Sequence, residues 1–175
     1  MAQPAPAAEP SSGAGRPLSV GRRRAAILAV AAVVVVIDQL TKTWALHHAV
    51  APRHIVGTLR LALTFNSGAA FGLGQGSTAV LVGGAIVLVV ILLGLGRRAS
   101  RNATPTTAVA MGLLLGGAIG NLVDRLIRHN HASVIDFIDL RWWPVFNVAD
   151  ASITIGAILL VVAGVMGRPR SARPE

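Results

Sequence analysis

The chain has 175 residues, of which 53% are hydrophobic and only 13% are charged. An ordinary soluble domain is roughly 45–50% apolar and about 25% charged, so this composition excludes a soluble enzyme and indicates a polytopic membrane protein. The absence of cysteine excludes disulfides, thiolate metal sites and cysteine catalysis. A net charge of +9 would favour a nucleic-acid-binding protein only if the basic residues shared one soluble face.

The N-terminal part predicts a tail followed by a first membrane span. Residues 1–20 are mostly Ala, Pro, Gly and Ser, which predicts a disordered tail. Arginines at 22–24 then precede an apolar segment, and we predict a transmembrane helix at about residues 25–46. A cleaved signal peptide is the alternative, because the small residues 49–51 complete that template. The further apolar segments downstream favour a retained helix.

Polar residues lie near the end of this first span. Asp38 and Lys42 are four residues apart, which places them on one helical face as an ion pair. We favour a structural pair over a catalytic role, because a charge at this depth is tolerated when it is paired.

The loop after the first span, residues 46–77, contains a candidate strand. Residues 55–65 are β-branched and apolar with partial alternation, which predicts a short strand or hairpin against the membrane surface. Asn66, Ser67 and Gly68 follow and are typical of a turn. The functional alternative is a loop whose amide groups bind an extended substrate backbone.

Two more spans follow in the middle of the chain. Residues 78–96 are almost entirely apolar and are followed by Arg97, Arg98 and Arg101. A third span is predicted at residues 106–124, and its spaced glycines would let another helix approach closely. These glycines are Gly112, Gly116, Gly117 and Gly120.

The third span ends in polar residues, Asn121, Asp124 and Arg125. An interfacial salt bridge between Asp124 and Arg125, beside a glycine packing face, is the plain structural interpretation. A phosphate-binding loop is excluded, because no strand precedes the segment and the Gly-x-Gly-x-x-Gly pattern is missing.

The second long loop, residues 124–150, leads into a fourth span at residues 151–167. Asp136 is a carboxylate embedded between apolar neighbours. Trp142 and Trp143 fit an aromatic belt at headgroup depth. Asp150 directly precedes the fourth span and can be explained as a helix N-cap. Residues 168–175 form a short basic tail.

The charges beside the four predicted spans set an orientation. Ten of the 16 lysines and arginines fall on the side of the two termini, which places both termini in the cytoplasm. This topology and anionic lipid headgroups explain the basic excess, so we expect no nucleic-acid partner. Five acids fall on the outer side: Asp38, Asp124, Asp136, Asp139 and Asp150. Any chemistry is therefore expected at the outer interface.

The outer acids point to aspartic protease chemistry. Two carboxylates in a low-dielectric site cannot both ionise easily, so one keeps a proton while the other acts as a base toward water. Spacing does not select the pair among five acids. The His-Glu-x-x-His and Gly-x-Ser-x-Gly motifs are missing, so zinc and serine chemistry are not favoured. We expect no metal and no cofactor, and interpret the paired histidines as solvated: His47, His48, His129 and His131.

Five segments, taken in order, resemble lipoprotein signal peptidases (signal peptidase II), a family of four-span aspartic proteases of bacterial membranes. They are DQLTK at 38–42, NSGAAFG at 66–72, GGAIGNLVDR at 116–125, VIDFI at 134–138 and FNVAD at 146–150. The resemblance extends over about residues 27–165. The long N-terminal tail and a slightly extended, histidine-bearing stretch at 128–133 depart from the family pattern.

The resemblance implies roles for individual residues. The catalytic pair would be Asp136 and Asp150. Five residues would line the substrate groove or orient the pair: Asn66, Gly68, Asn121, Arg125 and Asn147. Three would be structural or would support the groups around the pair without touching the substrate: Asp38, Lys42 and Asp124.

The resemblance also implies an activity and a location. The enzyme would be an aspartic endopeptidase of the bacterial inner membrane that removes the signal peptide from diacylglyceryl-modified prolipoproteins, cutting just before the lipidated Cys. The expected fold is an all-α polytopic membrane protein of four transmembrane helices with a small extracytoplasmic β and loop subdomain. We expect one membrane domain at 21–167, a monomer, a prolipoprotein substrate and membrane lipids as partners, and an active site on the outer side.

Two functions of other classes remain open. A proton-coupled transporter would also use membrane carboxylates, but it would place one near the middle of a span, whereas every acid here lies at a predicted helix end. A non-catalytic membrane scaffold would explain the glycine-rich third span. It gives no reason for Asp136 and Asp150 to coincide with Asn121, Asn147 and Arg125 on one surface.

Overall fold

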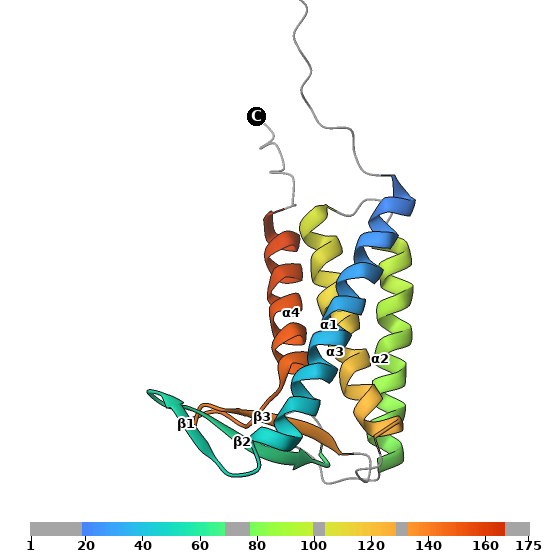
Figure 1. The fold of residues 1–175 in the computed structure, drawn as a ribbon. Coiled ribbons are helices and arrows are strands. Elements are labelled where there is room, and N and C mark those ends of the chain that lie inside the picture. The colour runs from blue at the N-terminus through green and yellow to red at the C-terminus, as the bar shows by residue number, and fades with distance from the viewer. Residues whose placement is uncertain (1–18, 69–77, 100–103, 129–132, 167–175) are drawn as a thin grey trace, which may run out of the picture.

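The computed structural model describes residues 19–68, 78–99, 104–128 and 133–166. Four helices pack into a bundle, and a small sheet lies at one end of it (Figure 1). The elements in chain order are α1 (Val20–His48), β1 (Arg53–Val56), β2 (Leu59–Asn66), α2 (Thr78–Ala99), α3 (Pro105–Leu126), β3 (Val134–Asp139) and α4 (Val148–Met166). Of the predicted tail 1–20, residues 1–18 lie outside the described residues, and Ser19 and Val20 are not tail, because they cap and begin α1. Residues 69–72, the histidine-bearing 129–132 and the predicted tail 168–175 also lie outside the described residues.

Each predicted span lies within one helix, except that the last residue of the fourth span, 167, is outside the described residues. Capping groups set the starts of two helices. Ser19 accepts a hydrogen bond from the backbone N–H of Arg22, so α1 begins at Val20, five residues before the predicted start. Thr104 accepts one from the N–H of Thr107, and Pro105 occupies the first turn of α3. The apolar pattern locates the span, whereas the polar cap decides where the helix begins.

Length and hydropathy single out two of the described helices, α1 and α3, as able to cross a membrane. α2 and α4 carry shorter apolar stretches, Val82–Gly94 and Val148–Gly164. The helical, membrane-like fold with a small sheet is thus confirmed, and the count of four spans stays a prediction.

α3 is the central helix, and its glycines let neighbouring helices approach. A Cβ atom on Gly112 would lie 2.6 Å from Cβ of Val30 in α1, and one on Gly116 would lie 2.7 Å from Cβ of Val34. These distances are too short for any residue larger than glycine without movement. The predicted packing role of the glycines is confirmed here.

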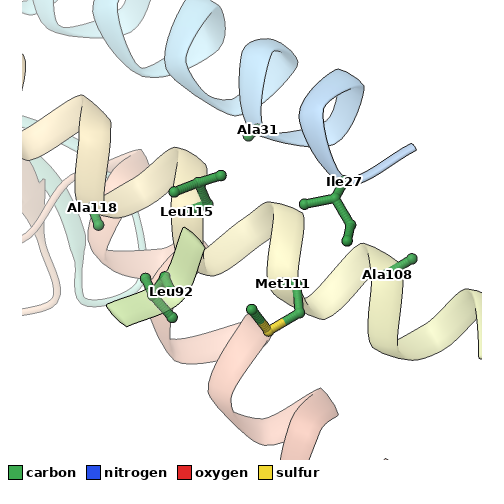
Figure 2. Close-up of a cluster of buried hydrophobic side chains, with 7 residues drawn as sticks. All are labelled: Ile27, Ala31, Leu92, Ala108, Met111, Leu115 and Ala118. Atoms are coloured by element: carbon green, nitrogen blue, oxygen red, sulfur yellow. The ribbon is translucent and has the colours of Figure 1, made fainter. Parts of the chain in front are cut away.

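The interior of the bundle is apolar and joins α1, α2 and α3. Figure 2 shows the side chains of this cluster, which are Ile27, Ala31, Leu92, Ala108, Met111, Leu115 and Ala118. The outward faces are apolar too, with exposed Leu28, Val33, Val36 and Leu40 on α1, Val87, Val90 and Ile91 on α2, and Ile155, Ile158 and Val161 on α4. A soluble monomer rarely exposes apolar surface of this extent.

The sheet has the order β1-β2-β3 with antiparallel neighbours. β1 and β2 form the predicted hairpin, whose turn includes Gly57 at a φ of 56°. The third strand, β3, was not predicted from the sequence. Its residues are nearly all buried, so they lack the alternation that marks a half-exposed strand.

Candidate active site

β3 carries Asp136 into the end of the bundle. The strand pairs with β2, where Thr64 lies opposite Asp136. The Asp136 side chain is 1% exposed, and both of its oxygens accept hydrogen bonds. Oδ1 accepts from Asn147 Nδ2 at 2.7 Å, and Oδ2 accepts from Asn66 Nδ2 at 3.0 Å.

A chain reversal after β3 brings the start of α4 back beside Asp136. Arg141 adopts a φ of 69°, and its backbone N–H donates to Asp139 Oδ1 at 2.7 Å. Phe146 then pairs with Ile138 through hydrogen bonds of 2.9 and 3.0 Å between their backbone groups. The next residue, Asn147, is therefore placed next to the strand.

Asp150 lies in the first turn of α4 and is not the N-cap that the sequence suggested. Asn147 holds that place: its Oδ1 accepts from the Asp150 N–H at 2.9 Å. Asp150 Oδ2 in turn accepts from the Asn147 N–H at 3.3 Å, which completes a reciprocal cap. The helix begins at Val148, three residues before the predicted 151, because Asn147 offers the capping oxygen.

Three asparagines surround the two carboxylates, and a donor holds the oxygen of each. Asn66 Oδ1 accepts from the Gly68 N–H at 3.0 Å, and Asn121 Oδ1 accepts from Lys42 Nζ at 3.0 Å. Asn147 Oδ1 is held by the Asp150 N–H. An amide whose oxygen is held must present its NH₂ group elsewhere. Accordingly, Asn121 Nδ2 donates to Asp150 Oδ1 at 2.8 Å, and the other two donate to Asp136.

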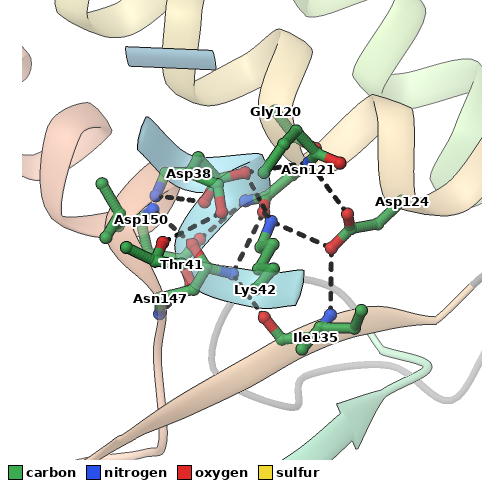
Figure 3. A network of polar contacts seen from close by, with 12 residues as sticks. Asp38, Thr41, Lys42, Gly120, Asn121, Asp124, Ile135, Asn147 and Asp150 are labelled. Atoms are coloured by element: carbon green, nitrogen blue, oxygen red, sulfur yellow. Dashed lines mark hydrogen bonds and ion pairs between the residues drawn. The ribbon is translucent and has the colours of Figure 1, made fainter. Parts of the chain in front are cut away.

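A buried ionic cluster around Lys42 lies next to Asn121 and Asn147 (Figure 3). Lys42 is fully buried and pairs with Asp38 at 2.8 Å and with Asp124 at 2.9 Å. The predicted Asp38–Lys42 pair is confirmed. Gln39, to which the sequence analysis gave no role, donates to both Asp38 and Asp124. Its position inside the DQLTK segment was the only sequence signal for it.

The predicted salt bridge between Asp124 and Arg125 is wrong. Neighbouring residues on a helix point in different directions, and Asp124 pairs instead with Lys42 and with Arg128, four residues on, at 3.4 Å. Arg125 points the other way and donates from NH2 to the carbonyl oxygen of Gly68 at 3.1 Å.

The five outer acids divide by their partners. Asp38 and Asp124 are paired with Lys42, and Asp139 is paired with Arg60 at 2.5 Å. Within the described part of the chain, Asp136 and Asp150 have no ion-pair partner. Tertiary contacts thus separate one pair of carboxylates from the rest, which spacing alone could not do.

The pKa values of the two acids on β3, Asp136 and Asp139, are shifted in opposite directions. Burial and the nearby charge of Asp150 raise the pKa of Asp136 to about 7. The hydrogen bonds from Asn66 and Asn147 and the charge of Lys42 lower it, but by less. At the other end of the strand, the N–H of Arg141 and the Arg60 side chain hold the pKa of Asp139 below its usual value. Asp136 can therefore keep a proton near neutral pH, whereas Asp139 is an ordinary carboxylate.

A groove of about 240 Å³ opens beside Asp150. Apolar side chains make most of its walls, and the polar lining residues are Asn66, Asn121, Arg125, Asp150 and Thr154. Among the residues that the structure describes, Arg125 Nε is the buried side-chain nitrogen without a hydrogen-bond partner. The groove thus offers a free, charged donor next to Asp150.

The remaining candidates lie away from this groove. His47 and His48 are exposed at the end of α1, as expected, whereas His129 and His131 lie outside the described residues. Trp142 and Trp143 are exposed on the loop after β3. Across residues 19–68, 78–99, 104–128 and 133–166, no three His, Asp or Glu side chains are grouped so that they could hold a metal ion.

The proteins and the family that this chain resembles agree with one another. The chain is 42% identical over 174 residues to a lipoprotein signal peptidase of Mycobacterium tuberculosis (strain ATCC 25618 / H37Rv), which covers 95% of this chain and 85% of the relative. It is 45% identical over 152 residues to one of Mycobacterium avium (strain 104), covering 83% and 82%. Among solved structures, a bacterial membrane enzyme determined by the in meso method at 2.3 Å resolution matches with a TM-score of 0.75 and 29% identity, covering 86% of this chain and 94% of that one. Residues 30–166 match the signal peptidase (SPase) II family, and the chain belongs to that family.

Proposed function

We propose that the protein is an aspartic endopeptidase that removes signal peptides from prolipoproteins, with Asp136 and Asp150 as its catalytic pair. Family membership and the shared name of its relatives support the activity. One observation carries the assignment of the pair. Buried Asp136 and half-buried Asp150, the two outer carboxylates without an ion-pair partner among the described residues, are joined by Asn147, which bonds to both of them, and Asp150 lines a groove of about 240 Å³.

The chemistry follows from sharing one proton between two carboxylates. Asp136, with its pKa raised to about 7, holds the proton, and ionised Asp150 removes a proton from a water molecule. The water oxygen attacks the scissile carbonyl carbon. The proton on Asp136 stabilises the developing oxyanion and passes to the leaving amine as the C–N bond breaks, while Asp150 keeps the proton taken from water, so that the pair again shares one proton. Neither a metal nor a covalent intermediate takes part.

The asparagines and Arg125 would orient this pair and the substrate. Asn66, Asn121 and Asn147 direct NH₂ groups at the carboxylates and so fix their rotation. Arg125 Nε would donate to a carbonyl oxygen of the extended substrate, since it is buried at the groove with no partner in the described chain.

The substrate is a prolipoprotein that carries diacylglyceryl on a Cys, and the bond cut is the one just before that Cys. A lipid anchor restricts the scissile peptide to one depth in the membrane. If that depth is the level of Asp136 and Asp150, the anchor supplies part of the catalysis by proximity.

We further propose that all four helices span the bacterial inner membrane as one domain at about 20–167, with tails at 1–18 and 168–175. The apolar outward faces of α1, α2 and α4 support contact with lipid. The excess of basic residues beside the helix ends opposite the sheet supports cytoplasmic termini, and the site then lies on the outer side. The enzyme acts as a monomer, with membrane lipids as its surroundings.

The test is cleavage of a diacylglyceryl-modified prolipoprotein by the purified protein in detergent. Wild type is expected to cleave with or without a chelator. Asp136→Asn and Asp150→Asn should each lower kcat by at least about 100-fold, as expected for loss of a general acid or base. Asp139→Asn, on the same strand but paired with Arg60, is the matched control and should stay active.

The alternatives predict different results. Uncleaved substrate from folded wild type would contradict the peptidase, and a proton flux in vesicles would then favour a transporter. Retained function in both Asp136→Asn and Asp150→Asn would favour a scaffold.

A further inference from the structure

Lys42 lies at the junction of the buried cluster and uses all three of its ammonium hydrogens. Nζ contacts Asp38 Oδ2 at 2.8 Å, Asp124 Oδ2 at 2.9 Å and Asn121 Oδ1 at 3.0 Å. The side chain is fully buried, and its ion-pair partners among the described residues are Asp38 and Asp124 rather than Asp136 or Asp150. Figure 3 shows Lys42 with these two partners. Each of its three partners, however, holds a group next to one of these aspartates.

The first contact leads to the start of α4. Asp38, on α1, uses its other oxygen to accept a hydrogen bond from the backbone N–H of Ala149 at 2.9 Å. Ala149 immediately precedes Asp150. The Lys42–Asp38 pair therefore holds the first turn of α4, and with it the backbone of Asp150, against α1.

The second contact leads to β3. Asp124, on α3, accepts a hydrogen bond from the backbone N–H of Ile135 at 3.0 Å, through the same oxygen that contacts Lys42. Ile135 immediately precedes Asp136. The Lys42–Asp124 pair therefore holds the strand segment that carries Asp136.

The third contact acts through an amide. Lys42 donates to Asn121 Oδ1, so the NH₂ group of Asn121 points at Asp150 Oδ1, which it reaches at 2.8 Å. Asn147 Nδ2 is the second donor to Asn121 Oδ1, at 3.1 Å. If the Asn121 amide were rotated by half a turn, its oxygen instead of its NH₂ group would face the Asp150 carboxylate, and the two oxygens would repel each other.

We propose that Lys42 is a positioning residue that fixes the separation and orientation of the two catalytic carboxylates from α1, although it belongs to neither of the segments that carry them. Two carboxylates attach it to the backbone just before Asp136 and Asp150, and one amide attaches it to the side chain of Asp150. Stability alone does not require such a cluster, because buried ion pairs can often be replaced by apolar groups at no net cost. This inference rests on the proposed function.

The experiment compares Lys42→Met with the double variant Asp38→Asn/Lys42→Met. The single variant leaves Asp38 buried without its cation and should lower Tm. The double variant removes both charges, keeps an oxygen at position 38 for the Ala149 N–H, and leaves Asp124 paired with Arg128, so its Tm should recover. Its kcat should nevertheless stay about 100-fold below that of wild type, as expected for a small misplacement of catalytic groups, while KM changes by less than about 3-fold.

Arg60→Met is the matched control, since it removes the Arg60–Asp139 ion pair from the same sheet and should leave kcat unchanged. A double variant with recovered Tm and a kcat within about 2-fold of wild type would overturn the positioning role, because Lys42 would then be only structural. Failure of wild type itself to cleave the prolipoprotein would overturn the proposed function and this inference together.

Discussion

Asn147 and Asp150 cap the first turn of α4 for each other: Asn147 Oδ1 accepts the N–H of Asp150 at 2.9 Å, and Asp150 Oδ2 accepts the N–H of Asn147 at 3.3 Å. The remaining NH₂ group of Asn147 donates to Asp136 Oδ1 at 2.7 Å. One side chain therefore begins a helix and orients the neighbouring carboxylate. Serine can do the first of these and is too short for the second.

Replacing Asn147 by alanine and by serine should separate its two roles. Asn147→Ala removes the cap and should lower the free energy of unfolding by about 1 kcal/mol, together with a large loss of kcat. Asn147→Ser keeps a capping oxygen, so stability should recover while kcat stays low. Thermal unfolding and prolipoprotein cleavage measure the two effects. A serine variant as active as wild type would show that the contact with Asp136 is dispensable.

The rate should fall as the pH rises above neutrality. Burial and Asp150 raise the pKa of Asp136 to about 7, so its proton is lost on the alkaline side of that value. The hydrogen bond from Asn66 lowers this pKa, and Asn66→Ala should therefore move the alkaline limb of the kcat profile to higher pH. The apparent value belongs to the carboxylate pair rather than to one residue. An alkaline limb that does not move in Asn66→Ala would contradict this origin.

The same shift makes stability depend on pH. A carboxyl group whose pKa is higher in the folded protein stabilises the fold fully at pH below its unfolded value, and that stabilisation is lost as the pH rises through the folded value. The contribution of Asp136 should fall between about pH 3.8 and pH 7. Asp136→Asn should flatten this part of the Tm profile measured in detergent. An identical slope in wild type and variant would mean that Asp136 has an ordinary pKa in the folded protein.

Gly117 is where α3 approaches the start of α4. A Cβ atom there would meet the carbonyl oxygen of Ala149 and lie 2.7 Å from Ile153 Cγ1. Gly117→Ala should destabilise the protein by about 1–3 kcal/mol and reduce kcat, because α4 and Asp150 must shift. Gly84→Ala, at a helical glycine with no atom within 4 Å of the added Cβ, is the control and should leave Tm and kcat unchanged. Equal effects at both positions would refute a specific contact.

Arg125 should act on the substrate more than on the fold. Arg125→Lys keeps the positive charge but has a single nitrogen, which cannot stand both at the NH2 position that bonds to Gly68 and at the Nε position in the groove. The loss of one charged hydrogen bond predicts a fall in kcat/KM of about 10- to 100-fold. Cleavage kinetics over a range of substrate concentrations would measure it, and an unchanged kcat/KM would place Arg125 outside the binding site.

Much of the helical part of this fold could be predicted from sequence, because long apolar segments flanked by arginines specify helices without reference to the rest of the chain. The hairpin at 53–66 also follows from local pattern. β3 could not be predicted in this way. It is buried on nearly all sides, so its sequence carries no alternation, and its pairing with β2 is a contact between segments about seventy residues apart.

Apolar segments and flanking charges were enough to predict that acids gather near one end of the bundle, and the ordered motifs singled out Asp136 and Asp150 by resemblance. Which acids meet a cation depends on the packing of distant segments. Lys42 from α1 takes Asp38 and Asp124, Arg60 from β2 takes Asp139, and the last two carboxylates are left facing asparagine amides. The physical reason is that the protonation state of a carboxylate depends on its burial and on charges within a few ångströms, and those neighbours come from parts of the chain that are distant in sequence.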